Sequence, residues 1–328
     1  MTEKNKDFCR IHYIDIIKGI GIFLVVFQHT VDISNLSRWI LSFHMPLFFI
    51  VSGFLFKMKL EKIFLHAKIC QLLLPQILVE IINIIIAVVI LILHAGNPKV
   101  LFLGVRWFMI TLFLSNIMFY FIMKNVERYI HSGILLFIFS SISMIFGLCF
   151  ATLSPDSSNF FSLALISVFF LFCGYKIKNY GISEWFQNRR FLSLGIGIIL
   201  IGVTYFLAQK NRDVFMYSGS FGNPILFLNN ALTGTFGVWC FAIFLKQNRF
   251  LEFLGNNSLI ILFFHFPVMR IAGMFFSQVL RMNVTTVATQ IMIFFLTITL
   301  CLILSPLINR YFPILAGKVK TLEPEIPQ

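Results

Sequence analysis

The chain has 328 residues, of which 59% are hydrophobic and 12% are charged, and its mean hydropathy is +0.90. This composition excludes an ordinary soluble globular domain, in which about 25% of residues are charged, and it indicates an integral membrane protein. The formal net charge is +13, but the basic residues lie in short segments between apolar runs. That distribution argues against nucleic-acid binding and for a role in membrane topology.

Apolar runs of about twenty residues are long enough to cross a bilayer as helices. The sequence predicts ten of them, at 11–31, 40–56, 69–93, 105–123, 132–152, 159–175, 191–208, 225–245, 258–280 and 286–308. We therefore expect an all-α integral membrane protein, a bundle of about ten transmembrane helices that forms one domain over residues 11–310. Lys and Arg concentrate in segment 1–10, in the tail 311–328 and in alternate connections. The positive-inside rule then predicts two cytoplasmic termini and a multi-pass protein of the cell (cytoplasmic) membrane.

The first span, YIDIIKGIGIFLVVFQHT from Tyr13, contains Asp15, Lys18 and His29. Ionisable groups inside a bilayer are costly, so they are functional candidates unless they are paired. Lys18 and His29 are eleven residues apart, which in a helix is about three turns and about 16 Å along one face. On the predicted topology His44, in the second span, comes to the same outer half as His29.

Two interpretations of these residues stay open. In the structural one, Asp15 and Lys18 form an i,i+3 ion pair, and His29 hydrogen-bonds a neighbouring helix. In the functional one, His29 is a general base for a hydroxyl nucleophile, and Lys18 binds an anionic co-substrate.

Further polar groups fall in the third and fourth spans. Glu80 lies near the middle of the third span, where a carboxylate needs a partner or a proton. A structural hydrogen bond to Lys18, Asn83 or the backbone and a role in the site are equally compatible with the sequence. Arg106 and Trp107 open the fourth span and either anchor it at the interface or contact a substrate through a guanidinium and a ring face.

The ninth span follows the sequence LGNNSLIILFFHFPVMR from Leu254. Asn257 or Ser258 is expected to cap this helix, and the free N–H groups there also suit a phosphate-bearing donor. His265 lies about two turns further along. Four lysines in the second inner connection are first a topology and lipid-headgroup signal, with recruitment of a polyanionic cofactor as the second interpretation; they are Lys57, Lys59, Lys62 and Lys68.

At these residues the chain resembles the membrane-bound acyltransferase 3 family, in particular its branch of fucose 4-O-acetylase-like proteins. Four ordered segments carry the resemblance: Lys18 with ten residues and then His29, FHMPLFFIVSGFLF from Phe43, RWFMITLF from Arg106, and LGNNSLIILFFHFPV from Leu254. Many members have Arg where this chain has Lys18, and Lys cannot make Arg's bidentate fork. Some relatives carry an appended extracytoplasmic domain, which this chain does not show.

The resemblance implies about ten helices and transfer of an acetyl (acyl) group from acetyl-CoA to a hydroxyl of a cell-envelope carbohydrate or lipid-linked glycan. It also implies that His29 is catalytic and that Lys18 serves the donor side. We expect no metal. The remaining expected contacts are Asp15, His44, Glu80, Arg106, Trp107 and His265 with the substrate, and Asn257 and Ser258, beside Lys18, with acetyl-CoA.

Two other functions fit the sequence less well. The first is a transporter or flippase for a lipid-linked sugar or small solute, for which paired halves with broken helices are typical; no such pairing is seen here. The second is a non-enzymatic scaffold or sensor in contact with membrane lipids, which does not need ionisable residues on one face of a span. The sequence does not specify the oligomeric state.

Overall fold

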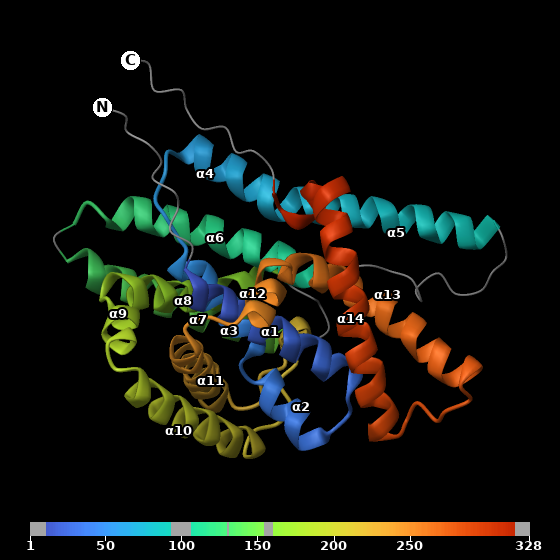
Figure 1. Cartoon of the computed structure of the whole chain (residues 1–328). Coiled ribbons are helices and arrows are strands. Elements are labelled where there is room, and N and C mark those ends of the chain that lie inside the picture. Colours follow the sequence, from blue (N-terminus) through green and yellow to red (C-terminus); the bar gives the residue numbers. More distant parts are fainter. Residues whose placement is uncertain (1–10, 93–105, 130, 154–159, 319–328) are drawn as a thin grey trace, which may run out of the picture.

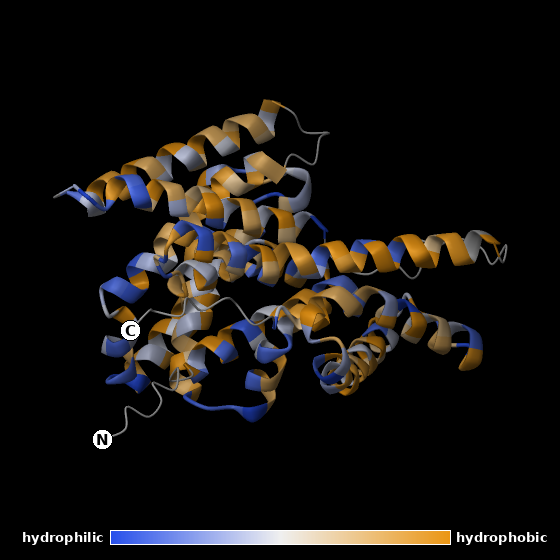
Figure 2. Cartoon of the chain, turned by 90° about the horizontal axis from the view of Figure 1, so that it is seen from above, coloured by the Kyte–Doolittle hydropathy of each residue, from blue (hydrophilic) through white to orange (hydrophobic). Residues whose placement is uncertain are grey.

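The computed structural model describes residues 11–92, 106–129, 131–153 and 160–318, and the regular elements of these ranges are helices (Figure 1). By length and composition, ten helical segments of this described part could cross a membrane. The prediction of an all-α, multi-pass membrane protein is thus confirmed. Figure 2 shows hydrophobic residues along the long helices and hydrophilic residues at many of their ends. The cytoplasmic placement of the termini stays a prediction.

The helices follow one another with short connections. The ten segments are α1 (His12–Thr30), α2 with α3 (Ser34–Leu41 and His44–Phe54), α4 through α5 (Glu61–Lys68, the π-turn Ile69–Leu73, Leu74–Ile92), α6 (Arg106–Val126), α7 (Ser132–Leu153), α8 (Phe160–Asn179), α10 (Arg190–Gln209), α11 (Pro224–Leu245), α13 with a π-turn (Ser258–Met274, Phe275–Val279) and α14 (Val287–Tyr311). Shorter elements are α9 (Ile182–Gln187), α12 (Arg249–Asn256) and the 3-10 turns Met216–Ser218 and Pro313–Ala316.

The second span differs from the predicted run 40–56, because it begins at Ser34 and is broken between α2 and α3. Pro46 lies in the first turn of α3. A proline has no backbone N–H and its ring clashes with the carbonyl four residues earlier, here that of Ser42, so a break in the helix is favoured at this point. The break brings His44 to the beginning of α3, where its side chain is buried.

The third span also begins earlier than the predicted residue 69. Helix α4 starts at Glu61 and passes through the π-turn Ile69–Leu73 into α5, as the continuous blue-to-cyan ribbon of Figure 1 shows. Pro75 follows this turn and cannot donate to Gln71, which explains the local widening. Lys68 consequently lies on a helix rather than in a loop.

Close contacts between backbones hold α1 against α12. A Cβ on Gly19 would overlap the Leu251 carbonyl of α12, and a Cβ on Gly255 would overlap the Asp15 carbonyl of α1. Small residues that let two backbones approach are typical of helix pairs in membranes, where van der Waals packing replaces the hydrophobic effect. The two glycines therefore fix the part of α1 that carries Asp15.

A second pair of glycines joins α3 to α8 in the same way. A Cβ on Gly53 would overlap the Leu171 carbonyl, and one on Gly174 would overlap the Ile50 carbonyl. Because α3 is the second half of the broken second span and begins with His44, this contact sets the position of His44 relative to the rest of the bundle.

Candidate functional site

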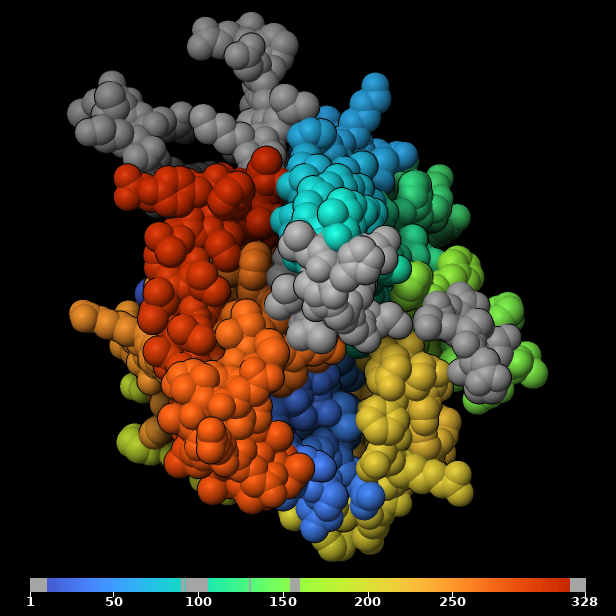
Figure 3. All heavy atoms as spheres, turned by 90° about the vertical axis from the view of Figure 1, so that its right-hand side faces the viewer, coloured from blue at the N-terminus to red at the C-terminus, as the bar shows by residue number. Residues whose placement is uncertain are grey.

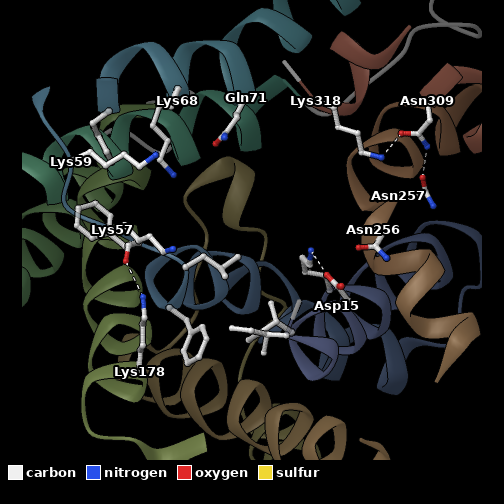
Figure 4. Close-up of a pocket in the computed structure, with 18 of the residues that line it drawn as sticks. Asp15, Lys57, Lys59, Lys68, Gln71, Lys178, Asn256, Asn257, Asn309 and Lys318 are labelled. Atoms are coloured by element: carbon white, nitrogen blue, oxygen red, sulfur yellow. Dashed lines mark hydrogen bonds and ion pairs between the residues drawn. The ribbon is translucent and has the colours of Figure 1, made fainter. Parts of the chain in front are cut away.

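A large basic cavity lies at the Lys18 end of α1. Its volume is about 1190 Å³, and it is surrounded by the ends of α1, α3, α4, α8, α12 and α14. Its polar lining residues come from these elements and from the segments that join them, and Figure 4 labels all of them except Lys18. They are Asp15, Lys18, Lys57, Lys59, Lys68, Gln71, Lys178, Asn256, Asn257, Asn309 and Lys318. Among the described residues six lysines face one carboxylate, so this part of the lining attracts anions.

Lys18 is not an isolated cation in this cavity. Its Nζ lies 2.7 Å from Asp15 Oδ1, one turn earlier on α1. This part of the structural interpretation is therefore confirmed, and the lysines contributed by other elements carry most of the excess charge. One of them, Lys318, donates to Asn309 Oδ1 at 2.6 Å, which holds its ammonium at the rim (Figure 4).

The N-terminus of α13 lies beside the same cavity, but its expected side-chain cap is absent. Asn257 occupies the capping position without a capping hydrogen bond. Its Nδ2 donates to the Phe253 carbonyl at 2.8 Å, and its Oδ1 accepts from Asn309 Nδ2 at 2.6 Å. The short helix α12 packs so closely before α13 that its last carbonyls compete for the amide. Asn257 lines the cavity, whereas Ser258 is not among its lining residues.

At the other end of α1, His29 lines two adjoining recesses. Their volumes are about 410 Å³ and 250 Å³, and both are lined by Gln28, His29, Leu41 and Phe215. The larger recess is polar and reaches α14, while the smaller one contacts His44 and Trp107. Figure 3 shows the blue N-terminal helices between the orange and red helices α13 and α14 and the yellow segments of the chain.

Two histidines line these recesses, and a third is buried beside them. The rings of His29 and His265 have centroids 5.5 Å apart, the ring of Phe266 is 4.7 Å from that of His29, and His44 lines the smaller recess together with His29. The sequence predicted the approach of His29 and His44. It also named His265 as a substrate contact, but His265 is fully buried beside His29 and lines neither recess.

The protonation of two of these imidazoles follows from their contacts. His44 Nδ1 lies 2.8 Å from the Ile40 carbonyl, and His265 Nδ1 lies 2.9 Å from the Leu262 carbonyl. A carbonyl can only accept, so each Nδ1 carries the proton and each Nε2 presents a lone pair. The Nε2 atom of His265 is buried without a hydrogen-bond partner. Within the described chain the imidazole of His29 has no hydrogen bond, and its side chain is exposed to the recesses.

Glu80 and Arg106 do not line the basic cavity or either recess. Arg106 forms a two-point ion pair with Glu80, Nη2 to Oε2 at 2.7 Å and Nε to Oε1 at 2.9 Å, and Gln76 donates to Glu80 Oε1 at 2.7 Å. Their structural role is therefore to link α5 to α6, with Arg106 rather than Lys18 or Asn83 as the charged partner of Glu80. Trp107, by contrast, lies in the smaller recess as expected.

A closed layer separates the cavity from the recesses. Ile22 and Val25 lie on the same face of α1 as Lys18 and His29, and they are only 1% and 2% exposed. The ring of Phe48 and the side chain of Leu47 pack beside them, close to Gly21. The lining residues of the basic cavity and of the two recesses do not overlap.

Several lining residues were not singled out from the sequence. In the recesses they are Gln28, Arg38, Asp213, Phe215, Tyr217 and Gln290, and in the cavity they are Gln71, Lys178, Asn309 and Lys318. They come from α1, α2, the π-turn Ile69–Leu73, α8, the connection between α10 and α11, α14 and the segment after Pro313–Ala316, so only the tertiary structure brings them together. In the described residues no group of three or more His, Cys, Asp or Glu side chains could hold a metal ion.

Comparison with known proteins gives one match. Residues 11–306 match the model of a family described as an acyltransferase domain. No curated protein and no solved structure matches the chain. The match covers the four sequence segments quoted above, and the fucose 4-O-acetylase-like branch stays a prediction.

Proposed function

Because the chain belongs to the acyltransferase 3 family, we propose that it transfers an acetyl (acyl) group from acetyl-CoA to a hydroxyl of a cell-envelope carbohydrate, with His29 as general base. One observation supports this proposal above the others. A cavity lined by six described lysines and a recess lined by His29 and His44, with His265 buried beside His29, lie at opposite ends of the same face of α1.

The basic cavity fits the donor. Coenzyme A carries three phosphate groups, and lysine ammonium groups bind phosphates as point charges. Lys57, Lys59 and Lys68 come from α4 and the segment before it, and Lys178 and Lys318 come from two other elements. Cations on several sides suit a branched polyanion better than a single phosphate. On the predicted topology this end faces the cytoplasm, where acetyl-CoA is made.

His29 fits the role of the base. Its ring is accessible from both recesses, and a neutral imidazole has one ring nitrogen with a lone pair that can accept a proton. As the acceptor oxygen bonds to the thioester carbonyl carbon, His29 accepts the hydroxyl proton. The tetrahedral intermediate then collapses, the carbon–sulfur bond breaks, and His29 returns the proton to the departing CoA thiolate.

The acyl arm of the donor crosses the layer of Ile22 and Val25. From Lys18 to His29 the helix rises by about 16 Å, a distance that an extended pantetheine arm spans. Phe48 is the partly exposed member of this layer, and we propose that its ring turns aside when the donor binds. Closure of the layer between turnovers keeps water away from the thioester.

Acetyl transfer separates this function from the transporter alternative. Proteoliposomes containing the full-length chain are given acetyl-CoA labelled in the acetyl group, together with a glycan extract of the cell envelope. We expect label in ester linkage to carbohydrate on the side opposite the donor. Accumulation of solute without covalent label would support transport instead. Mass spectrometry of envelope glycans from cells with and without the protein identifies the acceptor.

A further inference from the structure

We infer that the recesses at His29 are an acceptor site built for an uncharged sugar, and that anionic sugars such as uronates are disfavoured there. This inference rests on the proposed function and adds the chemical class of the acceptor. It starts from the charges that line the recesses. Among the residues that the structure describes, these are Asp32, Arg38 and Asp213 in the larger recess, and no Asp, Glu, Lys or Arg lines the smaller one.

Arg38, the one cation among the described residues of the larger recess, is already paired. Arg38 Nε donates to Asp213 Oδ1 at 2.7 Å, which ties α2 to the connection between α10 and α11. With Asp32 exposed nearby, the lining carries two carboxylates and one guanidinium. A carboxylate on the substrate would lose hydration without gaining a free countercharge, which costs binding free energy. The basic cavity at the other end of α1 has an excess of positive charge instead.

The uncharged side chains that line the smaller recess match a sugar. The rings of Trp107, Phe215 and Tyr217 line the smaller recess, and aromatic walls with a few polar groups are typical of small-molecule sites. Gln28 lines both recesses, and its Oε1 is buried without a hydrogen-bond partner. This carbonyl oxygen can accept from a sugar hydroxyl close to His29.

The walls of this site are held in place by hydrogen bonds. Asn211 is buried, and its Oδ1 accepts from the backbone N–H groups of Arg212 and Asn223 at 2.9 Å and 2.7 Å. Gln209 donates to the Asn35 carbonyl at 2.9 Å. The connection that carries Asp213 and Phe215 is thus a formed wall that fixes Asp213 opposite Arg38.

Matched glycoside pairs test this inference. The full-length protein in lipid nanodiscs is given methyl glucoside or methyl glucuronide, and methyl galactoside or methyl galacturonide. Binding is measured by saturation-transfer-difference NMR, and labelled acetyl-CoA reports transfer. We expect the neutral member of at least one pair to bind and to be acetylated at least tenfold more efficiently than its uronide.

Three variants test whether the Arg38–Asp213 ion pair causes the preference for neutral glycosides. Asp213→Asn leaves Arg38 without its partner and should raise the uronide-to-neutral ratio about tenfold. The double variant Asp213→Asn with Arg38→Gln should return that ratio to the wild-type value. Glu61→Gln is the matched control, because it removes the carboxylate that pairs with Lys124 far from the recesses and should leave the ratio unchanged.

The outcomes for the two proposals are distinct. Uronides that bind as well as neutral sugars, an unchanged ratio in Asp213→Asn, or no binding of either member of any pair would overturn the inference. Acetylation of any envelope hydroxyl would still support the proposed function in each of these cases. Binding of neutral glycosides without acetyl transfer to any acceptor would support the inference about the recess and contradict the proposed function.

Discussion

Replacing His29 with Phe separates the chemistry of the imidazole from its packing. The two ring contacts of His29, 4.7 Å to Phe266 and 5.5 Å to His265, can be kept by a phenyl ring. No hydrogen bond of the His29 imidazole to the described residues is lost. The free energy of unfolding should therefore change by less than about 1 kcal/mol, as for an ordinary exposed substitution.

The catalytic cost should be far larger. Loss of a general base lowers kcat by about 10² to 10⁴, which corresponds to about 3 to 5 kcal/mol of activation free energy. The assay measures initial rates of acetyl transfer to envelope glycan, thermal unfolding, and CoA binding, which should not change. His131→Phe is the matched control, because His131 is exposed and does not line the cavity or the recesses. A folded His29→Phe protein that kept more than a tenth of the wild-type kcat would refute the assignment.

Three further substitutions probe the donor cavity, the closed layer and the ion pair. Lys68→Gln should raise KM for acetyl-CoA about tenfold with little change in kcat, since it removes one charge-assisted contact to phosphate. Gly21→Ala should destabilise the protein by about 1 to 3 kcal/mol, because the new Cβ would lie 2.9 Å from Phe48 Cζ; thermal unfolding measures the change. Glu80→Gln should cost about 1 to 3 kcal/mol, and a double-mutant cycle with Arg106→Gln measures the coupling.

Each of these expectations has a control or a contrary result. Lys62→Gln changes an exposed lysine of the same helix that does not line the cavity, and an equal rise in KM there would remove Lys68 from the donor site. Gly195→Ala adds a methyl group with no heavy atom within 4 Å, so it should be neutral or stabilising, by up to about 1 kcal/mol. Independent, additive effects of the Glu80 and Arg106 substitutions would mean that their ion pair does not hold α5 on α6.

The sequence was sufficient for the architecture and for the central pair of residues. Composition and apolar runs predicted ten spans, and ten are found by length and composition among the described residues. The eleven-residue spacing placed Lys18 and His29 on one face of α1, and the structure puts them in the basic cavity and the recesses. Local periodicity is enough for such statements, because it depends on one helix alone.

The predictions that failed concern contacts between helices that are far apart in the sequence. The Arg106 partner of Glu80 comes from the next span, and the position of His265 beside His29 depends on how α13 crosses α1. The missing cap at Asn257 follows from the close approach of α12, whose carbonyl takes the amide. Single-sequence patterns contain no information about such contacts between helices.

The buried layer of Ile22 and Val25 has a consequence for the energised membrane in which this protein is expected to reside. Water-accessible hollows approach this layer from both ends of α1, and an open channel there would conduct protons and dissipate the gradient that drives ATP synthesis. A constriction of aliphatic side chains excludes water and blocks ion passage. The residues that the proposed donor arm would have to pass therefore also block ion flow, and substituting them with small polar side chains should make the membrane leaky to protons.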